Sequence, residues 1–360
     1  MLRKKSMLRS IVYGAGGLLV ALMTVTNTAT AASDTSRHGT ANCDSTITIP
    51  VALAPGQPAD ATLSGVLCQP KHHGKSSSVD ILVHGATYDR SYWDFGYQHP
   101  QYSYIQQAIQ DGRTVFFYDR LGNGKSSRLD STRVTMAADA YALHQVITYL
   151  EKHEHFRTIN VVGHSFGSLI SQLEASQYTD IDRLVITDAL QSTGPVLVNG
   201  LLQMVSANQV PQFAGAGYDD GWQVSKLGTK GAFYNTATAD PNVIAYDETH
   251  QGVASSTQLA EGRIQRVLPP DTNPIGKIKA PVLIVVGEQD GLYCGLAVDC
   301  TNKQAVLDFE KPYYKQARRL DVVTIPDSGH DINLQSHTAD VAKNIDKWLR
   351  TTPVNHWPHH

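Results

Sequence analysis

The stretch "NVVGHSFGSLIS", residues 160–171, decides the fold, because it joins a strand pattern to a helix pattern through a serine between two glycines. The apolar residues before Gly163 are typical of a buried strand, and "SLISQLEAS" after Gly167 is typical of a helix. The glycines allow a tight turn that holds Ser165 in a strained conformation with its oxygen exposed, beside the free N–H groups of the helix. The stretch therefore predicts a serine presented at the end of a central strand.

Short apolar runs recur on both sides of this turn and alternate with helical segments. In chain order they are "SVDILVHG", "RTVFFYDR", "TINVVGHS", "DRLVITDA", "APVLIVVGEQD" and "LDVVTIPDSGH". Residues 135–153 have apolar positions at three- and four-residue spacing, and "HTADVAKNIDKWLR" predicts a closing helix. The alternation indicates an α/β fold with a mostly parallel central sheet flanked by helices. Earlier, "STITIPVAL" and "ATLSGVLCQ" predict an N-terminal antiparallel pair.

Residues 191–279 interrupt the alternation, since they carry no comparable strand. They contain helical segments around a middle rich in glycine and aromatic residues. We expect a largely helical cap inserted over the carboxyl edge of the sheet, where open α/β sheets bind ligands. The mature chain then divides into a discontinuous core, residues 32–190 and 280–352, and this cap.

The amino terminus has the order of residues that is typical of a secretory signal. Four basic residues among the first nine precede an apolar stretch, residues 11–25, and the small residues "ATA" at 29–31. This order predicts that residues 1–31 are a signal peptide, that the mature chain begins near Ala32, and that it is extracellular. A retained membrane anchor is the alternative, but the apolar run is shorter than the roughly 20 residues that span a bilayer.

Four cysteines follow the signal, and export would place them in an oxidising compartment. Four cysteines allow three connectivities, of which the simplest joins neighbours: Cys43 to Cys68 and Cys294 to Cys300. A zinc site is disfavoured because the first two cysteines have no close partner in the sequence. The formal net charge of −3 over 360 residues offers no basic face for nucleic acid, so the expected partner is a small molecule.

Two later strand ends supply the groups that would activate the serine. A serine at its free pKa is a poor nucleophile, so a histidine must take its proton and an acid must orient that histidine. Asp290 follows one predicted strand and His330 the next, in the order Ser, Asp, His. Asp188, after an earlier strand, is the main alternative acid. Other loop acids that remain open are Glu288, Asp327 and Asp331.

A tetrahedral intermediate at Ser165 would carry an oxyanion that needs two N–H donors. Phe166, which follows the serine, is one expected donor. The loop after "DILVHG" supplies the other, from the backbone of Ala86 or, as the second choice, of Thr87.

Five motifs together resemble the α/β-hydrolase fold superfamily: "HGATYDRSYWD", "YDRLGNGKSS", "VVGHSFGS", "GEQD" and "DSGHD". The resemblance spans about residues 78–350, with the insertion in the position of that fold's cap domain. In this superfamily the loop "DRLGNGKS" usually shapes the sheet edge beside the active site, and its Gly-x-Gly lacks the spacing of a phosphate loop. A serine at position 165 argues against the dehalogenase and epoxide-hydrolase branches, which have an aspartate there.

The residues and the resemblance imply a secreted serine hydrolase that cleaves a small, apolar carboxylic ester or lactone through an acyl-enzyme, with no metal or cofactor. A peptidase or amidase and a cofactor-free perhydrolase remain alternatives, and a non-catalytic binding protein is disfavoured because the triad is intact. The sequence indicates no oligomeric state. Aromatic residues expected to line the substrate pocket are Tyr88, Trp93, Phe213 and Trp222.

Overall fold

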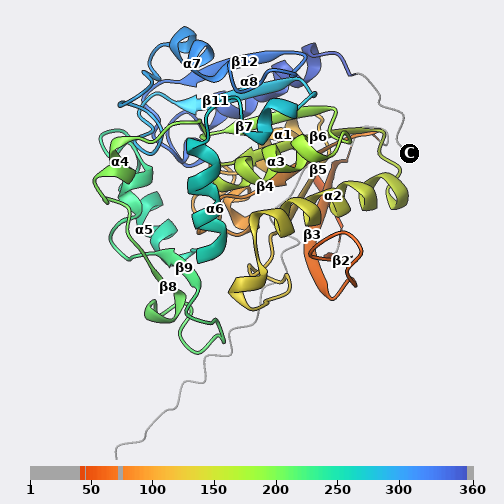
Figure 1. Cartoon of the computed structure of the whole chain (residues 1–360), viewed down its shortest axis with the longest axis horizontal. Coiled ribbons are helices and arrows are strands. Elements are labelled where there is room, and N and C mark those ends of the chain that lie inside the picture. Colours follow the sequence, from red (N-terminus) through yellow and green to blue (C-terminus); the bar gives the residue numbers. More distant parts are fainter. Residues whose placement is uncertain (1–40, 45, 72–75, 355–360) are drawn as a thin grey trace, which may run out of the picture. The chain divides into compact units, whose positions relative to one another are not determined.

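A nine-stranded sheet forms the centre of the computed structural model, which describes residues 41–44, 46–71 and 76–354 (Figure 1). Its main order is β1-β3-β5-β4-β6-β7-β11-β12, and β2 also pairs with β3. The strands are β1 (Ala41–Cys43), β2 (Ile47–Val51), β3 (Ala61–Pro70), β4 (Ser78–Val83), β5 (Val115–Asp119), β6 (Thr158–His164), β7 (Arg183–Thr187), β11 (Val282–Gly287) and β12 (Leu320–Ile325). The signal peptide predicted at residues 1–31 lies outside the described residues.

The six apolar runs of the sequence are the six parallel strands from β5 to β12 in this order, so the predicted α/β fold is confirmed. β6 pairs in parallel with β4 on one side and β7 on the other, which makes it an interior strand buried along its whole length. The predicted N-terminal pair is β2 and β3, which run antiparallel. The serine turn therefore follows a central strand.

Helices cover both faces of the sheet. The connections from β4 to β5 and from β5 to β6 run in opposite directions along the sheet, so right-handed crossovers place α1 (Tyr104–Gln110) and α2 (Met136–His153) on opposite faces. α8 (Thr338–Thr351) packs against α1, and α3 (Phe166–Gln177) packs against α2. α2 begins where expected, because the side chain of Thr135 caps it by accepting from the N–H of Ala138.

The insertion between β7 and β11 contains helices and also a small antiparallel sheet. Its helices are α4 (Pro195–Val198), α5 (Pro241–Thr249) and α6 (Ser256–Val267), with short 3-10 turns that include η5 (Lys230–Phe233). Three strands, β8 (Met204–Ser206), β9 (Trp222–Ser225) and β10 (Ala254–Ser255), form the order β10-β9-β8. The sequence predicted no strand here, because runs of two to four residues are too short to show an alternating pattern.

Both neighbour pairings of the cysteines are present. Cys43 and Cys68 occupy directly paired positions of β1 and β3, and their disulfide joins these strands. Cys294 and Cys300 close a short loop between β11 and α7 (Lys303–Glu310). Among the described residues, no helix is both long and apolar enough to cross a membrane.

Candidate active site

Ser165 lies in the turn between β6 and α3 with φ 51° and ψ −118°. This left-handed backbone is uncommon for a residue with a side chain, and it persists only where the surroundings impose it. Two flanking glycines impose it by close packing. A Cβ on Gly167 would lie 2.2 Å from the carbonyl oxygen of Val83, and one on Gly163 would lie 2.7 Å from the Cα of Ser168. The glycines therefore bring α3 against β4 and β6, and the serine takes up the strain.

Ser165, His330 and Asp290 form one hydrogen-bonded chain. His330 Nε2 lies 2.7 Å from Ser165 Oγ, and His330 Nδ1 lies 3.0 Å from Asp290 Oδ2. Both partners of the serine are buried, and each follows a parallel strand, β12 for the histidine and β11 for the acid. The second oxygen of Asp290 accepts from the N–H of Leu292 at 2.9 Å, which fixes the carboxylate toward His330. The structure thus brings together the three residues proposed from the sequence.

Asp188, the alternative acid, lies nearby with different partners. Its Oδ1 accepts from the N–H of Gly287 at 2.9 Å, and no hydrogen bond joins it to His330 in the described part of the chain. Burial raises the pKa of Asp188 well above its usual range, and the neighbouring Asp290 adds to this shift. A carboxyl group that stays protonated is poorly suited to stabilise an imidazolium, so the geometry favours Asp290.

The remaining loop acids face other groups. Glu288 accepts from the Thr324 hydroxyl at 3.3 Å, and Asp327 is exposed with a φ of 53°. Asp331 is buried and points away from the serine, toward His164 and Tyr88. None of the three contacts His330 as an orienting acid.

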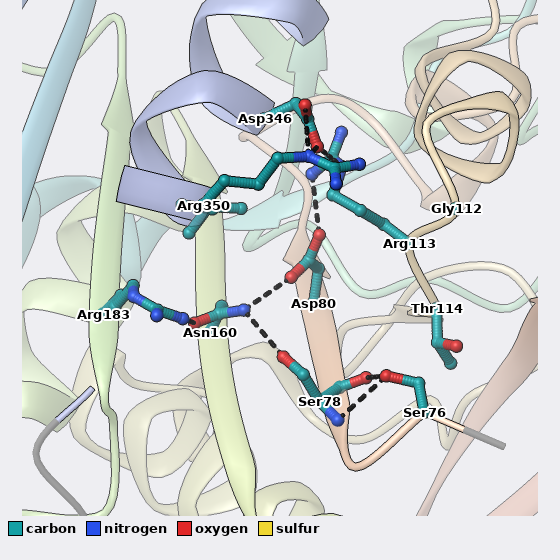
Figure 2. A pocket seen from close by; sticks show the side chains of 11 residues that line it. Ser76, Ser78, Asp80, Gly112, Arg113, Thr114, Asn160, Arg183, Asp346 and Arg350 are labelled. Carbon is teal, nitrogen blue, oxygen red and sulfur yellow. Dashed lines mark hydrogen bonds and ion pairs between the residues drawn. The ribbon is translucent and has the colours of Figure 1, made fainter. Parts of the chain in front are cut away.

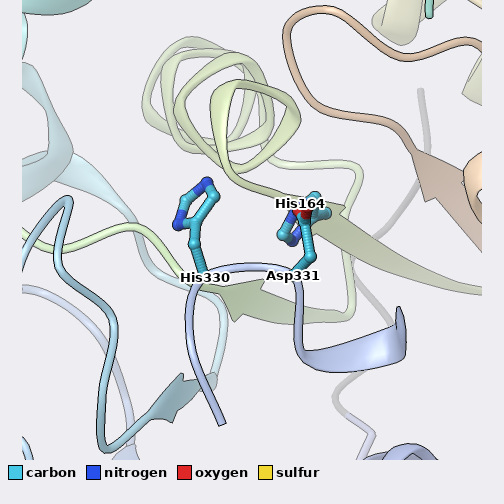
Figure 3. Close-up of side chains that lie close together, drawn as sticks. All are labelled: His164, His330 and Asp331. Atoms are coloured by element: carbon cyan, nitrogen blue, oxygen red, sulfur yellow. The ribbon is translucent and has the colours of Figure 1, made fainter. Parts of the chain in front are cut away.

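His164, His330 and Asp331 carry nitrogen and oxygen atoms within 4.8 Å of one another, an arrangement that resembles a set of metal ligands (Figure 3). Hydrogen bonds already use these atoms, since His164 Nε2 lies 3.1 Å from Asp331 Oδ1 and its Nδ1 lies 3.1 Å from the Thr187 hydroxyl. That hydroxyl donates to the carbonyl of Gly163, so it accepts from His164 Nδ1. His164 Nε2 is then an acceptor, and the proton of this bond lies on Asp331, whose pKa burial raises.

The loop after β4 passes directly beside the serine. Ala86 and Thr87 line the same cavity as Ser165, and a Cβ on Gly85 would lie 3.2 Å from that of the serine. Phe166 is the first residue of α3, so its N–H is one of those that a helix leaves without a carbonyl partner. Both expected oxyanion donors are therefore next to the serine.

Arg120 holds this loop from behind. Its Nε and Nη2 donate to the carbonyls of His84 and Gly85 at 3.1 and 3.0 Å, and its Nη1 pairs with Asp139 at 2.7 Å. Because the carbonyls point toward Arg120, the N–H groups of the next residues are free to face the cavity. The sequence assigned no role to Arg120, although it lies in the quoted "DRLGNGKS" motif.

A cavity of about 450 Å³ opens over Ser165, a volume within the usual range of small-molecule sites. Its lining is mostly apolar, with Phe166 and Leu169 from α3 and Phe233 from η5. The rings of Phe233 and Tyr293 lie 5.4 and 5.6 Å from the imidazole of His330 and shield it from water. The lining also includes Arg263 and Arg266, and much of it comes from residues 191–279, the insertion between β7 and β11 that is called the cap below.

The structure corrects the predicted lining of this pocket, which consisted of Tyr88, Trp93, Phe213 and Trp222. None of them lines the cavity over Ser165, and all four are buried in the core. Trp93 packs on Tyr92 and Tyr104, and Trp222 packs on Tyr218. Their large apolar area is used for packing between elements, which is the ordinary role of such side chains.

A buried lysine of the cap forms a network that the sequence did not reveal. Lys230 Nζ lies 3.1 Å from Asp247 Oδ1 and 3.6 Å from the centre of the Tyr88 ring. The Tyr88 hydroxyl lies 2.8 Å from Asp247 and 2.5 Å from Asp331. One hydroxyl proton can serve only one of these two carboxyl groups at a time. The network connects the cap to His164 and Asp331, the chain neighbours of Ser165 and His330.

A second cavity, of about 180 Å³, lies at the amino ends of β4, β6 and β7 (Figure 2). Four of its charged side chains form ion pairs with one another, since Arg113 bonds Asp80 at 2.7 Å and contacts Asp346 at 3.5 Å, and Arg350 pairs with Asp346. Arg183 instead donates to the Thr352 carbonyl and to Asn160. It contains no histidine beside a hydroxyl or thiol. This cavity therefore lacks the groups for nucleophilic catalysis.

The fold is similar to several solved structures at low identity, which bears on the fold alone. A thermophilic esterase from Thermogutta terrifontis is 18% identical, with 85% of this chain and 98% of that chain covered and a TM-score of 0.55. The 2-hydroxy-6-oxo-6-phenylhexa-2,4-dienoate hydrolase from Rhodococcus sp. strain RHA1 is 15% identical, with 85% and 99% covered and a TM-score of 0.53. The enol-lactonase from Burkholderia xenovorans LB400 is 18% identical, with 84% and 100% covered and a TM-score of 0.53.

A family model described as alpha/beta hydrolase family matches residues 81–344. The match includes the loop after β4, the serine turn, the cap, and the ends of β11 and β12 that carry Asp290 and His330. Because it spans well over half of the sequence, this chain belongs to the alpha/beta hydrolase family.

Proposed function

We propose that this protein is a serine hydrolase that cleaves a carboxylic ester or lactone through an acyl-enzyme intermediate. The observation that carries the proposal is the hydrogen-bonded chain from Asp290 through His330 to Ser165, which ends in a cavity large enough for a small substrate. The proteins of similar fold include an esterase and an enol-lactonase, which supports the same reaction class.

The first half of the reaction forms the acyl-enzyme. His330 Nε2 takes the hydroxyl proton of Ser165 as Oγ attacks the substrate carbonyl, and Asp290 stabilises the imidazolium at Nδ1. The N–H groups of Phe166 and Ala86 donate to the oxyanion of the tetrahedral intermediate. The intermediate then collapses, the bond to the alcohol breaks, and His330 gives its proton to the leaving oxygen.

The second half releases the acid. Water loses a proton to His330 as it attacks the acyl carbon, the bond from that carbon to Ser165 Oγ breaks, and His330 returns the proton to the serine. No metal or organic cofactor takes part in this scheme.

Ester hydrolysis tests the proposal. The wild type and Ser165→Ala are assayed with p-nitrophenyl esters of increasing chain length. Hydrolysis of p-nitroanilide amides tests the amidase alternative, and peroxide-dependent activity tests the perhydrolase alternative. We expect ester cleavage to exceed both other activities and the variant to lose about 10⁴-fold or more in kcat. Ester cleavage that survives in a folded Ser165→Ala protein would overturn the mechanism.

We also propose that the protein is secreted after removal of residues 1–31. The two cysteine pairs support an oxidising destination. N-terminal sequencing of exported protein should begin near Ala32, and an intact amino terminus would contradict this.

A further inference from the structure

One face of the cap helix α6 turns two arginines toward the cavity over Ser165. Leu259, Gly262, Arg263 and Arg266 follow the spacing i, i+3, i+4, i+7, which places them on one side of a helix, and all four line this cavity. The helix therefore presents an apolar part and a cationic part to the same chamber.

A close helix contact holds this face in place. A Cβ on Gly262 would lie 2.7 Å from the ring of Phe166 and 3.3 Å from Leu169, so the glycine lets α6 approach α3. The N-terminal turn of α6 is also tied to the core, since Gln258 donates to Asp139 at 2.6 Å and Glu261 accepts from the N–H of Met136 at 2.6 Å. The arginines extend from a fixed support rather than from a free loop.

No protein carboxylate neutralises the guanidinium groups of Arg266, which is half-buried, and Arg263, which is exposed at the edge of the cavity. Its lining contains no aspartate or glutamate, and neither Arg263 nor Arg266 forms an ion pair within the described chain. Glu261, the acid on the same helix, accepts a hydrogen bond from the backbone N–H of Met136 instead. The arrangement differs from that of Arg113 in the second cavity, which has two aspartate partners.

Arg266 also carries a buried donor without an acceptor. Its Nε is shielded from solvent and has no hydrogen-bond partner among the described residues, while its guanidinium lies 5.5 Å from the centre of the Tyr293 ring. A buried N–H that lacks an acceptor costs free energy, and because this Nε is closed to a water-sized oxygen, a bound anion would have to contact the other guanidinium nitrogens of Arg266. The pocket thus offers an anion positive charge that no acid of its lining neutralises.

We propose that the substrate is an ester or lactone that carries a carboxylate at the end remote from the scissile bond, bound by Arg266 and Arg263. The apolar lining accommodates the chain between the two ends. This inference rests on the proposed function for the position of the reacting carbonyl at Ser165. The small, apolar substrate expected from the sequence would then carry an anionic group at one end.

The test is a binding comparison on Ser165→Ala protein, which cannot turn the ligands over. Monomethyl adipate and methyl hexanoate have the same chain length and differ by a carboxylate in place of a methyl group. Charge-assisted hydrogen bonds contribute about 1.5 to 3 kcal/mol, so we expect monomethyl adipate to bind about tenfold or more tightly by calorimetry. The preference should shrink as salt is added.

Two further variants in the same background identify the residues responsible. Arg263→Gln with Arg266→Gln should abolish the preference. Arg157→Gln, which removes an exposed arginine just before β6, at the amino edge of the sheet, should retain it. Equal binding of the two esters, or a preference that survives in the double variant, would overturn the proposal.

Wild-type hydrolysis of the same two esters separates this inference from the proposed function. If the Ser165→Ala protein prefers the anion but the wild type cleaves neither ester, the anion site stands and the esterase proposal fails. If the wild type cleaves methyl hexanoate while the Ser165→Ala protein shows no preference, the esterase proposal stands and the anion site fails.

Discussion

Ser165 carries the backbone strain of the active site. The left-handed φ belongs to the serine and not to its two glycines, which act through the space they leave. A carbonyl oxygen at 2.2 Å from the Cβ position of Gly167 leaves no room for a side chain there. The strain is compensated by the packing of α3 on β4, and it aims Oγ at His330.

At the same scale, Asp290 and Asp188 differ in what they bind, and this difference predicts their roles. Asp290→Asn should lower kcat about 10³- to 10⁴-fold, because an amide cannot stabilise the imidazolium of His330. Asp188→Asn should lower it less than about tenfold, since the amide oxygen can still accept from Gly287. Steady-state kinetics on both folded variants checks this. A larger loss in Asp188→Asn would reverse the assignment.

The sequence could locate Ser165, Asp290 and His330 because each follows an apolar strand of clear pattern, and parallel strands bring their carboxyl ends to one edge. It could not choose firmly between the two acids, since that choice depends on hydrogen bonds such as Gly287 N–H to Asp188. The reason for the glycines was predicted as turn flexibility, whereas the distances show close packing.

At the scale of elements, the cap holds the loop that follows β4. The N–H of Gly252 donates to the carbonyl of Thr87 at 2.9 Å, and the hydroxyls of Ser225 and Thr87 lie 3.3 Å apart. Thr87 has a φ of 61°, a strained value for a β-branched residue, so these contacts fix a conformation that the loop would not adopt alone. The cap therefore helps to build the expected oxyanion site.

Lys230 should be the most sensitive lysine of the cap. Lys230→Met leaves the carboxylate of Asp247 buried without its cationic partner, with only the Tyr88 and Tyr234 hydroxyls as donors, and we expect the free energy of unfolding to fall by about 3 kcal/mol or more. Adding Asp247→Asn should recover part of the loss, because no buried charge remains. Chemical denaturation measures both.

Lys226→Met is the matched control, since Lys226 is exposed and bonds only an exposed glutamine side chain. It should change stability by less than about 0.5 kcal/mol. Equal effects of Lys226→Met and Lys230→Met would show that the buried pair does not stabilise the cap.

The cap was the part of the fold least predictable from sequence. Its interval was recognised because residues 191–279 lack long apolar runs, but its strands are too short for a periodic pattern. Lys230 looks like a surface residue in "LGTKGAF", and its burial follows only from the distant Asp247 and Tyr88. The pocket aromatics were misassigned for the same reason, since composition does not show which face of an element a ring occupies.

At the scale of the whole molecule, a buried glutamate links stability to pH. Glu310 is fully buried and accepts from the N–H of Gln191 at 2.7 Å, and its other oxygen has no partner in the part of the chain that the structure describes. Burial raises its pKa from 4.5 to about 8, and the bond from Gln191 opposes the shift. The folded protein therefore holds a proton that the unfolded chain loses above pH 4.5, so this contribution to stability declines as the pH rises from 4.5 to about 8 and stays constant above that.

Glu310→Gln should remove this dependence while keeping an oxygen for Gln191. We expect the variant to match the wild type near pH 5 and to melt several degrees higher at pH 9, by thermal denaturation. Asp308→Asn, an exposed acid on the same helix, should change neither value appreciably. If the melting temperatures of the wild type and Glu310→Gln differ by the same amount at pH 5 and at pH 9, Glu310 is not the source of the pH dependence.

The central claim is that Ser165 is an activated nucleophile, and a fluorophosphonate probe tests it most directly. We expect stoichiometric labelling of the folded wild-type protein, with the modified residue identified as Ser165 by mass spectrometry. We also expect no label on Ser165→Ala and slow labelling of His330→Ala, which lacks the base 2.7 Å from Oγ. A folded wild-type protein that takes up no probe, or that is labelled at another residue, would contradict the claim.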